Sequence, residues 1–210
     1  MASLVVSDPN LINAPPGWAQ VDALLGKYTQ PSAFGFIGSA GDLNRFWSRY
    51  RLAKSFREIA VEHFVPDTVQ GYSSLFRVFL VWSAFEHFMR ISGNNLGTMA
   101  ARLTPYDPDA LAAAVRATPD HDRFLSVILG ELDRKPHIDN LTAFLAGRPA
   151  NVLVIPAAIR HIFAHGKLTP NSGAGHVGAA NEISVHACDF LFRVMDGEFV
   201  QRLRDNGVAV

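Results

Sequence analysis

The stretch from Gln70 to Ser92 decides the fold; it reads QGYSSLFRVFLVWSAFEHFMRIS and is closed by Gly93. Its apolar residues lie around the whole circumference of a helix: Leu75, Phe76, Val78, Phe79, Leu80, Val81, Trp82, Phe85, Phe88, Met89 and Ile91. A helix that is apolar on every side is covered by other elements on every side. Arg77, Glu86 and Arg90 keep it short of the roughly 18–20 uninterrupted apolar residues that a membrane span needs. The stretch therefore predicts the central helix of a bundle.

Helical periodicity continues on both sides of this stretch. Before it, a helix is expected from Asp42 to a stop at Pro66, with an apolar stripe of Leu43, Phe46, Trp47, Tyr50, Ala53, Ala60 and Phe64. After it, proline and glycine punctuation predicts helices over Asp107–Ala117, Asp120–Leu132, His137–Leu145, Val152–His165 and Asn181–Arg204. No segment alternates with period two for long enough to form a sheet. The predicted fold class is all-α.

The chain divides into an extension and one domain. Residues 1–40 carry Pro9, Pro15, Pro16 and Pro31 among several glycines, which leaves room for only a short helix from Trp18 to Leu25. We expect this irregular segment to cover the bundle rather than to fold by itself. Residues 41–210 are expected to form the helical domain, and a chain of 210 residues is long enough to bury a core without a disulfide or a metal.

Composition narrows the functional classes. Nineteen basic and 19 acidic residues cancel, which argues against holding nucleic acid by phosphate neutralisation alone. Only 18% of residues are charged and 49% are hydrophobic, so we expect part of the surface to be buried against another copy. Cys188 is the single cysteine and the N-terminus resembles no secretory signal. We expect a soluble, cytoplasmic protein without a membrane span.

The segment Ile159–Gly166, IRHIFAHG, carries the residues with the clearest chemistry. His161 and His165 are four positions apart and share a helix face, while Arg160 stands roughly 140° from His165 around the axis. An arginine neutralises phosphate charge and a histidine moves protons near neutral pH, so the pair suits phosphodiester chemistry without a metal.

This arrangement resembles the R-x4-6-H signature of HEPN domains. In that family a polar residue commonly follows the arginine, and His161 occupies that place. Glu86 and Arg90 resemble the E-x3-K-R element of some members, although Arg90 replaces the lysine and Ile91 replaces the final arginine. The resemblance covers residues 42–205 in architecture.

The resemblance implies a helical homodimer whose two Arg-His motifs face each other across the interface. Members are often metal-independent endoribonucleases that need no cofactor, and many are toxins or defence effectors neutralised by a partner such as a minimal nucleotidyltransferase antitoxin. Carried over, Arg160 would hold the scissile phosphate, His165 would be the acid/base and His161 a polar helper. Glu86 would orient Arg160 or His165. Arg90 and Lys167 are candidates for binding the RNA backbone.

Other readings of the same residues stay open. The domain could be an inactive RNA-binding, nucleotide-binding or dimerisation module in which Arg160 and Glu86 form only a structural ion pair. Alternatively, His161 and His165 could hold a metal together with His87 or His63, although no H-E-x-x-H pattern is present and Arg160 then has no role. His87 by itself is typical of a core histidine, and His137 is expected in solvent at a helix start.

Overall fold

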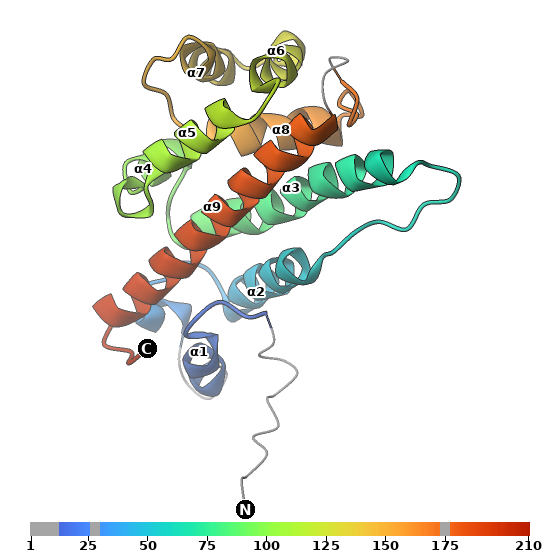
Figure 1. Cartoon of the computed structure of the whole chain (residues 1–210). Helices are drawn as coiled ribbons and strands as arrows, with labels where there is room; N and C mark the ends of the chain where they lie inside the picture. The colour runs from blue at the N-terminus through green and yellow to red at the C-terminus, as the bar shows by residue number, and fades with distance from the viewer. Residues whose placement is uncertain (1–12, 26–29, 173–176) are drawn as a thin grey trace, which may run out of the picture.

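The computed structural model describes residues 13–25, 30–172 and 177–210, and Figure 1 shows their arrangement. Within these ranges the chain forms α-helices and two short 3-10 helices, without a strand. The elements in order are α1 (Trp18–Leu24), η1 (Pro31–Phe34), α2 (Ala40–Ser55), α3 (Pro66–Ile91), α4 (Leu96–Ala100), η2 (Thr104–Tyr106), α5 (Pro108–Ala117), α6 (His121–Glu131), α7 (Lys135–Leu145), α8 (Val154–Ala164) and α9 (Val177–Asp205). The predicted all-α class is confirmed.

The helix α3 is the centre of the bundle, as its sequence predicts. It packs against α2, α8 and α9, and it crosses α9 in the middle of the molecule (Figure 1). Leu75, Val78 and Phe85 on α3 are completely buried. The helix begins at Pro66, four residues before Gln70, because proline suits the first helical position, where no intrahelical N–H bond is needed. In the described part of the chain, no helix combines the length and the apolarity required to cross a membrane.

The helix expected from Asp42 to Pro66 is shorter than predicted, which corrects the sequence analysis. It starts two residues early, at Ala40, after the capping box formed by Ser39 and Asp42, and ends at Ser55. The following segment is extended as far as Val65, and Phe64 there is 55% exposed rather than part of a buried stripe. The extended segment is fixed to α3, where the backbone N–H of Ile59 donates to Ser73 Oγ at 3.1 Å.

Residues 13–40, as far as the structure describes them, pack into the bundle. The Trp18 ring of α1 stacks on Trp47 of α2 with centroids 5.4 Å apart and planes 4° from parallel. Phe34 and Phe36 are each 1% exposed and belong to the same core. The expected short helix from Trp18 is therefore present, and it shares its core with α2 and α9. Residues 1–12 of the predicted extension, and residues 26–29, lie outside the described residues.

The shorter helices form one end of the molecule. The helices α6 and α7 contact each other and α8, while α5 contacts α6 and α9 (Figure 1). Three of them match the predicted helices 107–117, 120–132 and 137–145 within a few residues, and the single turn α4 and the 3-10 helix η2 precede them. This group positions the C-terminal end of α8, where the candidate residues lie.

Candidate active site

The candidate site is built at the C-terminal end of α8. This helix is buried along Val154–Ile159, so its position is fixed by packing, and Pro156 fits within its first turn. The helix closes with a Schellman motif, in which Gly166 N–H donates to Phe163 O at 3.0 Å and Lys167 N–H donates to Ile162 O at 3.1 Å. Gly166 has φ of 71°, a value that favours glycine. The motif leaves His165 exposed as the last residue of the helix end.

The two histidines of the motif touch. The rings of His161 and His165 have centroids 4.6 Å apart and meet edge to face at 69°. His161 is only 14% exposed in its side chain, and its Nε2 lies 3.5 Å from Asp133 Oδ1. Burial lowers the pKa of His161, the neighbouring His165 lowers it further, and Asp133 opposes the change. His161 is therefore a neutral group at pH 7, next to an exposed histidine.

Arg160 is held on its own side of the helix by a carboxylate and a ring. Its Nη2 lies 3.7 Å from Glu86 Oε2 of α3, and its Cζ lies 5.9 Å from the centroid of Phe79. A separation of 3.7 Å is an ion pair and is too long for a hydrogen bond. Arg160 Nε is buried, and no described residue accepts its hydrogen. A third of the side chain is exposed, so the guanidinium keeps donors for a ligand.

The structure brings four of the six predicted residues to this end of α8: Arg160, His161, His165 and Glu86. Lys167 is next to them, but its Nζ forms an ion pair with Glu131 Oε2 of α6 at 3.1 Å, so its charge is partly used. Arg90 points elsewhere: its Nη2 lies 3.1 Å from Oδ1 of Asp42, in the first turn of α2. Glu86 connects the two places, because it also lines a hollow with Arg90.

The start of α7 and the α6–α7 connection before it add residues that the sequence analysis missed. His137 is half-buried rather than in solvent, and its Nδ1 is buried without a hydrogen-bond partner among the described residues. Burial lowers the pKa of His137, and the charges of Arg134 and His161 lower it further. Asp133 and Arg134 come from the connection between α6 and α7. Their position near α8 depends on packing between helices, for which the sequence carries no local signal.

The metal alternative gains no support from the geometry. Within residues 13–25, 30–172 and 177–210, no group of three or more histidine, cysteine, aspartate or glutamate side chains is placed to hold a metal ion. His63 is on the extended segment with 93% of its side chain exposed, and both ring nitrogens of His87 already have partners. As expected, His87 is a core histidine, 4% exposed.

Comparison of the chain with protein-family models, with curated proteins and with solved structures finds no match.

Proposed function

We propose that this protein is a HEPN-like, metal-independent endoribonuclease whose active site is completed by a second copy of the chain. The observation that carries the proposal is the grouping of Arg160, His161 and His165 at the exposed end of α8. A charged guanidinium and an accessible imidazole are the two groups that cleavage of an RNA backbone requires without a metal.

The reaction follows from the roles of these groups. The ribose 2′-hydroxyl attacks the adjacent phosphorus, an O2′–P bond forms and the P–O5′ bond breaks. His165 takes the hydroxyl proton, and the His165 of the second copy supplies a proton to the leaving 5′-oxygen. Arg160 stabilises the additional negative charge on the phosphate oxygens. The products end in a 2′,3′-cyclic phosphate and a 5′-hydroxyl, and DNA is not a substrate because it lacks the 2′-hydroxyl.

His161 and Glu86 support the other two residues. Because His161 is neutral, it adds no positive charge next to His165, and its ring offers one hydrogen-bond donor and one acceptor. Glu86 orients Arg160 through the 3.7 Å ion pair and leaves its hydrogen-bond donors available. Glu86 is thus a positioning residue in the proposal.

Two observations support a site shared by two copies. His165 and most of the Glu86 side chain are open to solvent. Because water weakens electrostatic interactions, a phosphate bound at such an open site would gain little from the charged side chains around it. Beside Arg160, the rings of Phe76 and Phe79 are stacked with centroids 6.0 Å apart and are only half-buried. A second copy on this face would cover the rings and enclose the site.

The resemblance to HEPN domains extends the proposal to a cytoplasmic role as a toxin or defence effector that is neutralised by a nucleotidyltransferase-type antitoxin. This extension rests on the resemblance alone.

The alternative is an inactive HEPN-like module that binds RNA or nucleotide or only dimerises. The Arg160–Glu86 contact favours it to the extent that an ion pair between two helices needs no catalytic role. The two proposals give opposite results for RNA cleavage.

The test is RNA cleavage in excess EDTA by the wild type and by the Arg160→Ala and His165→Ala variants. We expect chelation to leave cleavage intact and each substitution to reduce its rate at least about 100-fold. His63→Ala is the matched control, because His63 is also an exposed histidine but lies on the segment between α2 and α3. A failure of the wild type to cleave mixed RNA, or full activity in His165→Ala, would reject the endoribonuclease proposal and favour the module.

A further inference from the structure

A second group of basic residues lies on α2 and α3, away from the end of α8. Arg45 and Arg49 are one turn apart on α2, and His87 and Arg90 are nearly one turn apart on α3. Together with Glu86 they line an open hollow of about 570 Å³ on the surface. The sequence analysis singled out only Arg90 of these arginines, because the other two are brought beside it by the packing of α2 on α3.

His87 contacts two of the arginines: it holds Arg49, and Arg90 Nη2 also lies 3.2 Å from its Nδ1. Its Nε2 lies 2.8 Å from the backbone oxygen of Asp42, which can only accept, so Nε2 carries the hydrogen. Its Nδ1 is then an acceptor and receives a hydrogen bond from Arg49 Nη1 at 2.9 Å. The ring is 4% exposed, and burial lowers its pKa, so the imidazole stays neutral. A buried neutral histidine thus holds a guanidinium at the edge of the hollow.

Asp42 orients the other two arginines. Its Oδ1 lies 2.8 Å from Arg45 Nη1 and 3.1 Å from Arg90 Nη2, while its Oδ2 accepts from the backbone and hydroxyl of Ser39. These hydrogen bonds lower the pKa of Asp42 to about 2, so the carboxylate is ionised throughout the physiological range. Asp42 aligns the guanidinium groups and neutralises only part of their charge.

The hollow keeps an excess of positive charge and of free donors. Three guanidinium charges face the carboxylates of Asp42 and Glu86, and Glu86 is also paired with Arg160. The described contacts use one terminal nitrogen of each arginine, whereas a guanidinium carries five N–H donors. The side chains of Arg45 and Arg90 are 63% and 62% exposed. Converging, oriented guanidinium groups are the arrangement that best matches the oxygens of a phosphate.

We propose that Arg45, Arg49 and Arg90 bind a backbone phosphate of the RNA next to the one that Arg160 and His165 act on; this inference rests on the proposed function. The two places are continuous, because Glu86 pairs with Arg160 and lies one turn of α3 before Arg90. The hollow is open, with nothing among the described residues that closes over a small ion, so it suits a strand that runs along the surface. The three arginines set where the strand lies, and the end of α8 cuts it.

The experiment measures binding of a fluorescent 2′-O-methyl RNA oligonucleotide, which cannot be cleaved because its 2′-oxygen is blocked. Anisotropy titrations over a range of salt concentrations compare the wild type, Arg49→Gln/Arg90→Gln and His165→Ala. Glutamine keeps an uncharged hydrogen-bond donor on the side chain, so the first variant removes the two positive charges without introducing an apolar surface. We expect it to bind at least about tenfold more weakly, with the salt slope reduced by about 0.7 for each lost contact.

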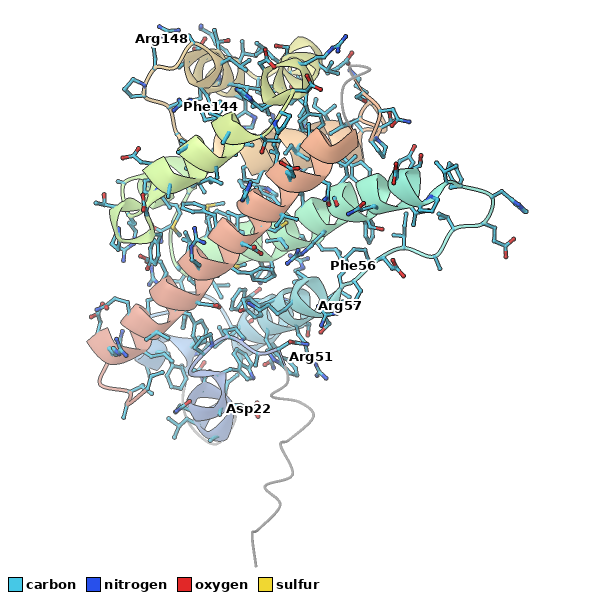
Figure 2. The ribbon with its side chains drawn as sticks, in the orientation of Figure 1. Asp22, Arg51, Phe56, Arg57, Phe144 and Arg148 are labelled. Atoms are coloured by element: carbon cyan, nitrogen blue, oxygen red, sulfur yellow. The ribbon has the colours of Figure 1, made fainter. Side chains whose placement is uncertain are left out.

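Controls separate this inference from the ribonuclease proposal. Arg148→Gln removes an exposed charge beside α7, far from α2 (Figure 2), and should leave affinity and salt slope unchanged. Unchanged binding by the double arginine variant, or binding of pyrophosphate but not of the oligonucleotide, would overturn the phosphate site even if wild type cleaves RNA. Arginine-dependent binding without cleavage of any RNA would instead uphold this site and reject the ribonuclease.

Discussion

Two arginine–glutamate pairs in this bundle differ in closeness and in burial. Arg102 Nε donates to Glu198 Oε2 at 2.7 Å, and the Glu198 side chain is 5% exposed. The hydroxyl of Tyr106 donates to the second oxygen of Glu198 at 3.3 Å. Arg160 and Glu86 are 3.7 Å apart, and 33% and 57% of their side chains are exposed. The first pair satisfies its partners and stabilises α9, whereas the second leaves its arginine available to a ligand.

The difference predicts that breaking the first pair lowers the stability of the protein much more than breaking the second. Arg102→Ala leaves the buried Glu198 carboxylate with Tyr106 as its remaining partner, so the free energy of unfolding should fall by about 2 kcal/mol; the partial exposure of Arg102 moderates the loss. Glu86→Gln should change it by less than about 0.5 kcal/mol, because the pair is open to water. Urea unfolding of both variants measures this.

Activity provides the second half of that comparison. Glu86→Gln should slow RNA cleavage roughly tenfold, about 1.4 kcal/mol, by loosening Arg160, and Arg102→Ala should leave the rate of the folded fraction unchanged. A large stability loss in Glu86→Gln with an unchanged rate would mean that both pairs are structural.

The backbone at the end of α8 offers a smaller change. A Cβ on Gly166 would meet no atom within 4 Å, so the cost of Gly166→Ala comes from its φ of 71° alone. We expect the free energy of unfolding to fall by about 1–2 kcal/mol. RNA cleavage should fall as well, because the Schellman motif positions His165. Gly130→Ala is a suitable control, since Gly130 has equal space but lies within α6, where alanine is favoured. Equal stability changes in the two variants would contradict this view of the helix end.

The stability of the protein should also depend on pH, because several of its histidines are buried or partly buried. Burial lowers the pKa of His87, His137 and His161 below the ordinary value of 6.5. As pH falls below 6.5, the unfolded chain takes up protons that the folded chain does not, so stability decreases until the lowered pKa values are passed. Asp42, with its pKa lowered to about 2 from 3.8, loses its contribution only below pH 4.

Urea unfolding at pH 7.5 and pH 5.5 tests this prediction. The wild type should be less stable at pH 5.5, and His137→Asn/His161→Asn should reduce the difference. Arg148→Gln should leave the difference unchanged, because Arg148 is exposed and arginine remains charged at both values. A double histidine variant with the full wild-type difference would show that the two histidines are not desolvated at the end of α8.

The parts of the fold that follow from local sequence could be predicted, and those that depend on contacts between distant residues could not. The apolar circumference of residues 70–92 and the glycine after His165 are local signals, and both α3 and the end of α8 match them. The early end of α2, by contrast, depends on contacts with residues distant in the sequence. It accompanies the contact of Phe56 with Phe76, whose ring centroids are 5.4 Å apart with planes tilted by 57°, and the hydrogen bond from Ile59 to Ser73.

The candidate site divides in the same way. Arg160, His161 and His165 lie close together in one predicted helix, and Glu86 is a charged residue in an otherwise apolar helix. These local features of the sequence are enough to select the four residues. His137 and the pair of Arg45 and Arg49 lie on other helices, and only the packing of α7 on α8 and of α2 on α3 brings them near. Nothing in their own stretches of sequence distinguishes them from ordinary surface residues.

The most direct test of the central claim is mass spectrometry of the products that the wild-type protein forms from RNA in excess EDTA. The same incubation is run with a 2′-O-methyl RNA of identical sequence and with the His165→Ala variant. We predict fragments with 2′,3′-cyclic phosphate and 5′-hydroxyl ends from RNA alone, and none from the methylated strand or the variant. Intact RNA, or fragments that also form from the methylated strand, would contradict an active site made by Arg160 and His165.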